Sequence, residues 1–405
     1  MQNNGFSAKI QKNERKKKMI YLDNASTTKC KESSAEIIRN ALVEDYFNPS
    51  AKYVEAFNEF KKLEEMRAEL LSLVNASPAN YSVVFTGSAT EANNLVLNSS
   101  MNKHNLNLIS AGEHASIYET AKNLKQNGYD ILLVKLTADG EIDLADLKAK
   151  LTQKVAFVSI MLVSNETGAI NDIEKITKLV KTANPKALVH VDAVQGFCKV
   201  KINVAKWGID YLTLSSHKVE GPKGVGALVY KKTAKLVPHI LGGGQENGKR
   251  SGTENLPSIL GFINSAKELI ADIDSNYKTV KDFKLNLIKS IKTHAKEASV
   301  EYLINGNPET GSPYVLSISF LGVKAEVLLH TLEKLGILVG TGSACNSHHS
   351  GNRVLSEMGR TQSEIEGNIR LSFLAETTTQ ITPDDLAKII VTEASKLKNT
   401  SSERK

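Results

Sequence analysis

The sequence predicts an α/β protein with a mostly parallel sheet covered by helices, followed by a smaller α+β domain. Two observations carry this prediction. Short apolar segments alternate with helical segments up to residue 230, as in sheets whose parallel strands are joined by helices. After about residue 262 the pattern changes to long amphipathic helices and short strands. The expected strands of the sheet span residues 81–85, 106–110, 131–134, 155–161, 188–192, 211–214 and 227–230.

Length and charge define the expected parts of the chain. It has 405 residues, which is enough for two or three domains. Part of its net charge of +7 lies in a lysine-rich stretch with no apolar segment, which is expected to be disordered. The expected parts are a basic head (residues 1–18), a large domain (19–262), a small domain (263–397) and a polar tail (398–405). The first segment of the large domain either stays with that domain or packs on the small one.

Composition excludes several classes of protein. No apolar stretch is long enough to span a bilayer, and the basic head lacks the apolar region of a secretory signal. The three cysteines are too few and too scattered for a disulfide framework, which fits a reducing compartment. Cys30 and Cys198 are interpreted as buried or incidental. We therefore expect a cytoplasmic protein with no membrane role.

The first 74 residues contain one ambiguous turn and one clear helix. After the apolar residues 20–24, the hydroxyls of residues 26–28 suit a turn that lines a pocket as well as a helix cap, and the cap is the simpler interpretation. In residues 53–74, apolar side chains such as Phe57 and Phe60 recur every three or four residues. This spacing predicts an amphipathic helix with a charged outer face.

A strand that turns directly into a helix outlines an anion site at residues 86–95. A glycine permits the tight turn, and the hydroxyls of Ser88 and Thr90 lie beside the free N–H groups of the first helical turn. These groups, together with the helix dipole, stabilise a phosphate. A plain strand-to-helix turn is the alternative, because the segment is neither a Walker A nor a GxGxxG loop.

Polar residues gather at the carboxyl ends of the expected strands, where parallel sheets bind ligands. A buried Asp192 would be costly unless it met a cation such as a protonated pyridine nitrogen. Desolvation beside His217 would lower the pKa of Lys218 enough for imine formation with an aldehyde, although an ordinary solvated lysine remains the simpler interpretation. The polar segments at this edge span residues 112–114, 165–168, 190–195 and 215–218.

The second half adds a cysteine and an arginine. Cys345 lies in a loop of small residues, 340–353, which is expected to be mobile. A strand at residues 368–373 carries Arg370. His348 and His349 beside the cysteine are interpreted as solvated, because a fourth metal ligand is not evident, and no metal site is expected.

Several motifs together resemble those of cysteine desulfurases, which are pyridoxal-phosphate-dependent members of the class V aminotransferases. The resemblance covers residues 19 to about 395 in motif order and spacing, and it implies a type I pyridoxal-phosphate fold working as a homodimer. After the arginine of residue 370 the family usually continues Ser-Leu-Gly, whereas this chain has Leu371, Ser372 and Phe373. The matching motifs are Leu22-Asp23-Asn24-Ala25-Ser26-Thr27-Thr28, His190-Val191-Asp192-Ala193-Val194-Gln195, Ser215-Ser216-His217-Lys218, Arg250-Ser251-Gly252-Thr253-Glu254-Asn255 and Gly342-Ser343-Ala344-Cys345.

The resemblance implies a role for each matching residue around pyridoxal phosphate. Lys218 binds the cofactor aldehyde covalently, Asp192 pairs with the pyridinium nitrogen, and His114 stacks on the ring. Asn165 and Gln195 contact the oxygen side of the ring. The phosphate is held by Ala89, Thr90, Ser215 and His217, and by Thr253 from the other subunit.

The resemblance also implies the reaction. Arg370, with Asn165, binds the carboxylate of L-cysteine as a planar fork of two donors. Lys218 removes the α proton, and Cys345, deprotonated by a base such as His114, attacks the substrate sulfur. The products are L-alanine and a persulfide on Cys345. The spacing after Cys345 resembles the longer-loop group that delivers sulfur to iron-sulfur assembly or tRNA thiolation acceptors.

Two other functions are compatible with the sequence. A selenocysteine lyase, or another class V lyase or aminotransferase, would use the same scaffold, and product formation from cysteine against selenocysteine separates these enzymes. A cofactor-free binding protein could use the basic head to grip nucleic acid or an acidic partner. The head is short and has no interleaved aromatic residues, so no direct nucleic-acid binding is expected.

Overall fold

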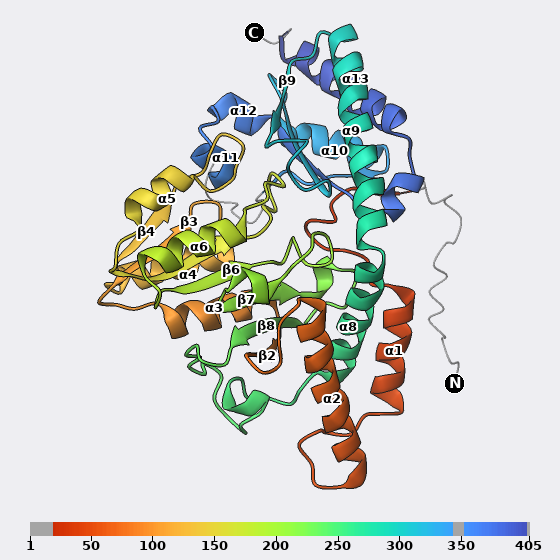
Figure 1. Ribbon diagram of the computed structural model, residues 1–405. Coiled ribbons are helices and arrows are strands. Elements are labelled where there is room, and N and C mark those ends of the chain that lie inside the picture. Colours follow the sequence, from red (N-terminus) through yellow and green to blue (C-terminus); the bar gives the residue numbers. More distant parts are fainter. Residues whose placement is uncertain (1–18, 343–351, 403–405) are drawn as a thin grey trace, which may run out of the picture.

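The computed structural model describes residues 19–342 and 352–402. It contains a seven-stranded and a three-stranded sheet, each with its own hydrophobic core, and Figure 1 shows the smaller sheet above the larger one. The expected basic head and three residues of the cysteine loop, Cys345, His348 and His349, lie outside the described residues. Within the described part, no helix combines the length and the apolar content needed to cross a bilayer.

The large sheet confirms the predicted, mostly parallel architecture. Its strand order is β2-β8-β7-β6-β5-β3-β4, and only β8 runs against its neighbours. Every expected strand occurs within one residue of its predicted bounds. The strands are β2 (Tyr81–Thr86), β3 (Leu106–Ser110), β4 (Ile131–Val134), β5 (Val155–Met161), β6 (Leu188–Asp192), β7 (Tyr211–Ser215) and β8 (Gly226–Lys231).

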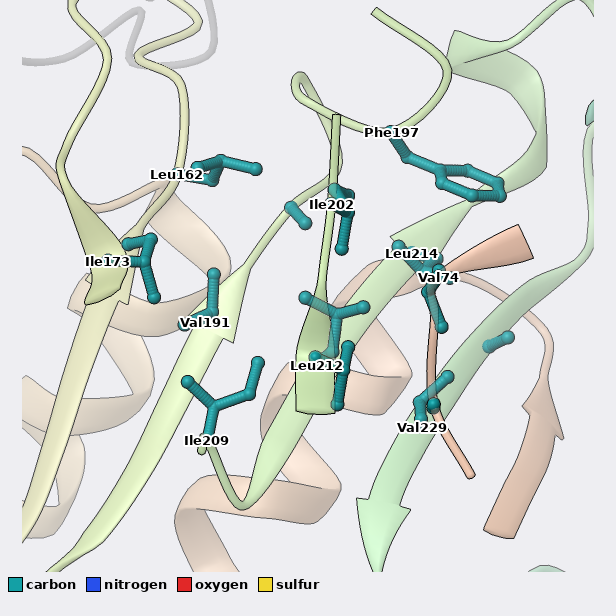
Figure 2. Packing of buried hydrophobic residues seen from close by; sticks show 14 of the residues in the cluster. Val74, Leu162, Ile173, Val191, Phe197, Ile202, Ile209, Leu212, Leu214 and Val229 are labelled. Atoms are coloured by element: carbon teal, nitrogen blue, oxygen red, sulfur yellow. The ribbon is translucent and has the colours of Figure 1, made fainter. Parts of the chain in front are cut away.

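Helices cover this sheet and close its core. Val191, Leu212 and Val229, from three neighbouring strands, are fully buried together (Figure 2). Burial of one such side chain contributes about 1.5–3 kcal/mol to folding. The helices of this part are α1 (Glu32–Val43), α2 (Val54–Leu73), α3 (Ala89–Ser100), α4 (Ala115–Gln126), α5 (Leu144–Lys150), α6 (Ile173–Ala183), α7 (Val204–Trp207) and α8 (Leu256–Ala271).

Helix α2 confirms the predicted helix but not the burial of all its apolar side chains. Leu63 and Leu70 are buried in the first core, whereas Phe57 and Phe60 are 53% and 44% exposed. The amphipathic pattern therefore extends beyond the face that packs within this chain. A sequence pattern marks apolar side chains without showing what covers them.

The second core is built on the three-stranded antiparallel sheet, in the order β12-β10-β9. The long helices α9 and α13 pack against each other beside it (Figure 1). Its elements are β9 (Tyr302–Asn305), β10 (Val315–Phe320), β12 (Asn368–Ser372), α9 (Ile273–Glu297), α10 (Ala325–Lys334) and α13 (Pro383–Ser402). Two short helices, α11 (Arg353–Glu357) and α12 (Gln362–Glu366), pack instead in a small separate cluster with Ala111 and Leu136.

The start of the described chain belongs to this second core. Strand β1 (Ile20–Tyr21) pairs with β11 (Ile337–Leu338), and Leu22 is fully buried in the second core. At the other end of the first core, α8 contributes buried side chains as far as Ala266, and Leu269 and Ile270 pack against the same core. We propose that the domain boundary lies near Asp272, between α8 and α9, about ten residues after the expected boundary at 262.

The residues that depart from the family pattern after Arg370 are well packed. Leu371 and Phe373 are at most 1% exposed, and the Phe373 ring lies edge-on to Phe283 at 5.5 Å between ring centres. Between them, the Ser372 hydroxyl accepts a hydrogen bond from the Ala25 N–H at 2.8 Å. The larger apolar residues therefore fill the second core behind the strand that carries Arg370.

Candidate active site

The segment of residues 23–28 crosses from the small sheet to the carboxyl edge of the large sheet. Asp23 forms a bridge with Ser372 of β12, and at the other end the Thr28 N–H and hydroxyl both donate to the carbonyl of His217. Helix α1 is capped by Lys31 without any side-chain bond, so the predicted helix cap by these hydroxyls is wrong. These residues instead form a turn that binds His217, Lys218 and Arg370.

Lys218 ends a short 3-10 helix (Ser216–Lys218) that follows β7. Its amine donates to the backbone carbonyls of Ala25 and Ser26, at 2.6 and 2.5 Å. Burial, then the cations Lys199 and Arg370, lower the pKa of Lys218 to about 7. A large fraction of this amine is therefore neutral at pH 7, which is the form that attacks an aldehyde.

Asp192 is a buried carboxylate at the end of β6. It is 3% exposed, and its two oxygens accept hydrogen bonds from the Asn93 amide and the Val194 N–H, at 2.9 and 3.0 Å. Among the described residues, no lysine, arginine or histidine forms an ion pair with it. A buried carboxylate without a cationic side-chain partner favours the binding of a cationic ligand.

His114 precedes α4 and caps it through its own ring. Its Nδ1 accepts the Ser116 N–H at 3.2 Å and lies 2.9 Å from the Ser116 hydroxyl, whose oxygen accepts from Asn93. Burial lowers the pKa of His114, so the ring is mostly neutral at pH 7. Because Nδ1 is an acceptor, the neutral ring carries its proton on Nε2.

The start of α3 presents free donors beside the end of β7. In the described part of the chain, the N–H groups of Ala89 and Thr90 donate to no partner, as expected for a first helical turn. Gly226, which pairs with Ser215, has no side chain, and a Cβ there would lie 2.8 Å from the Ala89 nitrogen. This close approach brings the helix N-terminus to the strand end, and the arrangement can hold an anion.

His217 completes this side of the site. Its Nδ1 lies 3.1 Å from the Thr27 hydroxyl, and burial together with the neighbouring Lys218 lowers its pKa to about 4. The ring is therefore neutral at pH 7 and can donate one hydrogen bond. His190, from the same polar segment as Asp192, takes no part, because it is buried in the core between Ser159 and Thr213.

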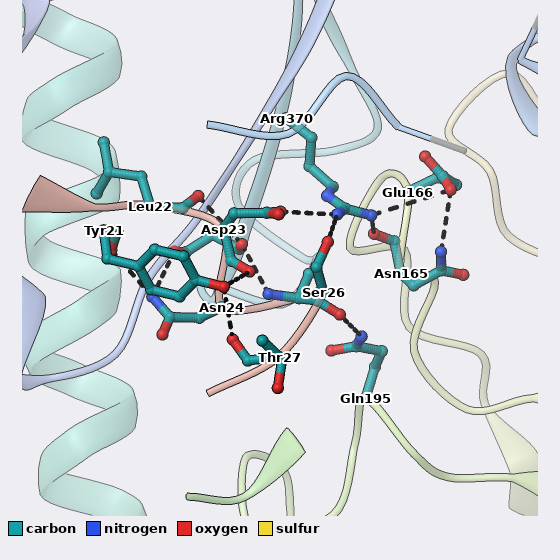
Figure 3. Close-up of polar contacts among 12 residues, drawn as sticks. Tyr21, Leu22, Asp23, Asn24, Ser26, Thr27, Asn165, Glu166, Gln195 and Arg370 are labelled. Atoms are coloured by element: carbon teal, nitrogen blue, oxygen red, sulfur yellow. Dashed lines mark hydrogen bonds and ion pairs between the residues drawn. The ribbon is translucent and has the colours of Figure 1, made fainter. Parts of the chain in front are cut away.

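Arg370 points from β12 into the same space, as Figure 3 shows. Its Nη2 donates to Asp23 and to the Ser26 hydroxyl, at 2.9 and 2.8 Å, and its Nη1 donates to the carbonyl of Asn165 at 2.9 Å. Its Nε is buried and has no partner among the described residues. The guanidinium is thus oriented by three contacts of its terminal nitrogens, and the buried Nε faces Gly340. A carboxylate ligand would bind the terminal nitrogens.

Gln195 approaches the same segment from the other side (Figure 3). Its amide donates to the carbonyl of Ala25 at 2.8 Å, and this carbonyl is also an acceptor for Lys218. Asn165 donates to Glu166 at 3.0 Å. The structure therefore places Gln195, Asn165, Arg370 and Lys218 around residues 23–28.

The described chain does not place two predicted residues, Cys345 and Thr253, in this group. Cys345 lies outside the described residues, but Gly342 and Asn352, which flank its segment, both lie beside Glu166: Asn352 donates to Glu166 at 3.1 Å, and a Cβ on Gly342 would lie 2.7 Å from the same carboxylate. Thr253 is exposed, and no hydrogen bond links it to the other site residues of the described chain.

Asn93, Ser116 and Lys199 are site residues that the sequence reasoning missed. Asn93 is one turn after Thr90 in the predicted phosphate segment, and its amide joins Asp192 to Ser116. Ser116 follows the predicted His114 by two residues and fixes the orientation of its ring. The helical spacing from Thr90 could have predicted that Asn93 faces the sheet. Its hydrogen bonds to Asp192 and Ser116 appear only in the folded chain.

The arrangement fits pyridoxal phosphate. Lys218 supplies a neutral amine for the aldehyde, Asp192 supplies a buried carboxylate for the pyridinium nitrogen, and the start of α3 supplies free N–H groups for the phosphate. Within residues 19–342 and 352–402, no group of three or more His, Cys, Asp or Glu side chains is arranged to hold a metal ion.

Comparisons with known proteins agree with this donor set. The family model described as aminotransferase class-V matches residues 20–381. Over 365 residues the chain is 33% identical to a cysteine desulfurase of Nostoc sp., and the match covers 89% of each chain. Its fold is similar to that of a NifS-like protein from Rickettsia africae, with a TM-score of 0.80 and 29% identity over 95% of this chain and 99% of that one.

A third comparison concerns a structure solved with an amino acid. The structure described as SspA in complex with cysteine has a TM-score of 0.73 and 26% identity, and the match covers 87% of this chain and 98% of that one. These findings confirm the predicted fold, family and cofactor. The chain belongs to the cysteine desulfurase family, the pyridoxal-phosphate-dependent class-V aminotransferases that act on cysteine.

Proposed function

We propose that this protein is a cysteine desulfurase that converts L-cysteine to L-alanine and transfers the sulfur to Cys345. The observation that carries this proposal is the position of Arg370, whose guanidinium binds Ser26 as the Lys218 amine does. Gly342 and Asn352, on either side of the Cys345 segment, both lie beside Glu166. A carboxylate site, an amine and a thiol are the three groups that this reaction requires.

The residues of the chain divide the work between binding and proton transfer. Arg370 and Asn165 hold the substrate carboxylate, and the neutral amine of Lys218 takes the α proton. Ala89, Thr90, Ser215 and His217 hold the cofactor phosphate, and Asp192 holds its ring nitrogen. Pyridoxal phosphate, when bound, supplies an electron sink for the substrate carbon.

Sulfur transfer requires a second nucleophile besides Lys218. Cys345 is the proposed nucleophile. It follows Gly342 by three residues in the sequence. Its thiolate forms a bond to the substrate sulfur as the bond from that sulfur to Cβ breaks, which leaves a persulfide on Cys345. The carbon fragment takes up protons and leaves as L-alanine.

His114 is the residue proposed to exchange a proton with Cys345. In the structure its neutral ring carries a proton on Nε2, so in this state it donates a hydrogen bond, which would stabilise a thiolate. Accepting the thiol proton at Nε2 would require the ring to give up its contact with the Ser116 N–H. The base that takes the thiol proton therefore stays a prediction.

A homodimer is the proposed assembly. Half of the exposed large apolar side chains of the described chain lie in and around α1 and α2, which both pack against α8. Contiguous exposed patches of this kind mark protein interfaces. The exposed Thr253 would then face the phosphate site of the other subunit. The apolar side chains are Leu42, Val43, Tyr46, Tyr53, Val54, Phe57 and Phe60.

The persulfide on Cys345 needs an acceptor, because a bound persulfide blocks the next turnover. We propose a sulfur-acceptor protein of iron-sulfur assembly or of tRNA thiolation, and we place the reaction in the cytoplasm. The two free cysteines of the described chain, Cys30 and Cys198, fit a reducing compartment.

The absorbance spectrum before and after addition of L-cysteine tests the proposed function. The purified protein is expected to show a visible band from its bound cofactor, to change that band with L-cysteine, and to release alanine and sulfide in the presence of a thiol reductant. Selenocysteine is the comparison substrate. A protein without the band, or one that releases alanine only from selenocysteine, would contradict the proposal.

Arg370→Lys is expected to raise the KM for L-cysteine about 10- to 100-fold, with little change in the cofactor spectrum. The reason is the loss of one charge-assisted hydrogen bond, worth about 1.5–3 kcal/mol. Steady-state kinetics with an unchanged KM would count against Arg370 as the carboxylate partner. Arg360→Lys is the matched control, because Arg360 is a partly buried arginine outside the site, and its only hydrogen bond within the described chain goes to the carbonyl of Ala138 at 3.0 Å.

A further inference from the structure

Lys199 is a buried lysine with no anionic partner. The residue is 5% exposed, and no carboxylate of the described chain lies within ion-pair distance of its amine. Burial lowers the pKa of Lys199 to about 8, so the amine is still mostly protonated at pH 7. A buried, unpaired cation costs free energy of folding, and such groups are concentrated at functional sites.

The contacts of this ammonium lead to the active site. Its Nζ lies 3.2 Å from the Gln195 side-chain oxygen, and the Gln195 amide donates to the carbonyl of Ala25. That carbonyl also accepts from Lys218, so one backbone oxygen joins the two lysines through Gln195. On the opposite side, Nζ lies 5.9 Å from the centre of the Tyr314 ring, which provides the cation with a favourable aromatic face.

The charge of Lys199 acts on Lys218 more strongly than any other nearby charge. After burial, Lys199 is the largest cause of the low pKa of Lys218, ahead of Arg370, while Asp23 and Asp192 oppose both. The Lys199 ammonium faces the Cys198 thiol and the Glu220 carboxylate, neither of which neutralises it. The other titratable groups near Lys218 are His114 and His217.

We propose that Lys199 is a positioning residue, whose buried ammonium holds Gln195 toward the cofactor site and keeps the Lys218 amine unprotonated by like-charge repulsion. The arrangement is the one that activates a lysine by a second cationic group in a desolvated site. Its importance for catalysis rests on the proposed function. The effect of Lys199 on the Lys218 amine is independent of the proposed function, because it requires only these two side chains of the protein and no substrate.

The test measures the amine of Lys218 directly in the full-length protein after removal of the cofactor. Acetic anhydride modifies neutral amines, and peptide mass spectrometry gives the modification rate of Lys218 as a function of pH. In the unaltered protein the rate is expected to be half-maximal near pH 7. In Lys199→Met the midpoint is expected to rise by about one pH unit, which lowers the rate at pH 7 about fivefold.

Two further variants separate charge from hydrogen bonding. Lys199→Gln removes the charge while keeping a polar partner for Gln195, and it is expected to shift the midpoint as Lys199→Met does. Lys199→Arg keeps the charge and is expected to restore the midpoint of the unaltered protein. A midpoint near pH 7 in both uncharged variants would overturn the proposal, whether or not the protein releases alanine from cysteine.

Lys284→Met is the matched control for a loss of stability. Lys284 is also a buried lysine, 3% exposed with its pKa lowered to about 8 by burial, but it lies on α9 and donates to the carbonyl of Ser312 at 3.0 Å. Its replacement is expected to leave the Lys218 midpoint unchanged. An equal shift in this control would show that general loosening of the fold, and not the charge of Lys199, moves the midpoint, and it would also overturn the proposal.

Discussion

Lys218→Ala is expected to lower the turnover of L-cysteine by at least about a thousandfold and to remove the covalent attachment of the cofactor. The reason is local. No other lysine of the described chain combines a low pKa with a position between Asp192, Arg370 and the phosphate-binding helix. Borohydride reduction followed by peptide mapping measures the attachment, and alanine release measures the turnover.

The same experiment has a control in the same loop. Lys223 is exposed and lies five residues after Lys218, so Lys223→Ala tests whether loss of any lysine near the site disturbs the reaction. This variant is expected to keep at least half of the activity. If Lys218→Ala kept normal activity with cofactor reduced onto another lysine, the assignment of Lys218 would be wrong.

The Lys218 amine of the cofactor-free protein is expected to react in a pH-dependent way. The pKa of Lys218 lies well below its ordinary value, so the neutral fraction rises as pH rises through about 7. Cofactor uptake by the cofactor-free protein is therefore expected to slow tenfold per pH unit well below pH 7. The neighbouring cations Lys199 and Arg370 cause part of this low pKa. They come from other segments of the chain, so the sequence around Lys218 does not reveal their effect.

The strands of the large sheet could be predicted because their signal is local. A buried strand needs a short apolar run, and each of the seven runs predicted as strands between residues 81 and 230 forms one. The exposure of Phe57 and Phe60 could not be predicted in the same way, because the pattern that marks a core face also marks a surface that meets another chain.

The site could be predicted in part for a related reason. Lys218, Asp192 and His114 lie at strand ends, and the carboxyl ends of parallel strands share one edge. Arg370 and the hydroxyls of residues 26–28 reach this edge only because β1 joins the small domain and the chain then crosses to β7. The contacts of Lys199 also depend on this crossing, so they appear only in the folded chain.

Cys345→Ser is expected to bind the cofactor and L-cysteine normally but to release less than about a hundredth of the alanine, because a neutral hydroxyl does not attack sulfur at neutral pH. Burial raises the pKa of the other two thiols, Cys30 and Cys198, which makes them poor nucleophiles. Cys198, beside Lys199, is fully buried against the carbonyl of Ala266. Neither of these thiols is therefore expected to replace Cys345.

Sulfur labelling provides the measurement. The protein is incubated with L-cysteine that carries radioactive sulfur, digested without reductant, and mapped for the labelled peptide, with Cys30→Ser as the control because Cys30 is the more accessible of the two described cysteines. The label is expected on the peptide that contains Cys345 in the unaltered protein and in Cys30→Ser, and on no peptide in Cys345→Ser. Label on a peptide without Cys345, or full alanine release by Cys345→Ser, would remove Cys345 as the sulfur acceptor and leave a cofactor-dependent enzyme whose binding site is the one built by Lys218, Asp192 and Arg370.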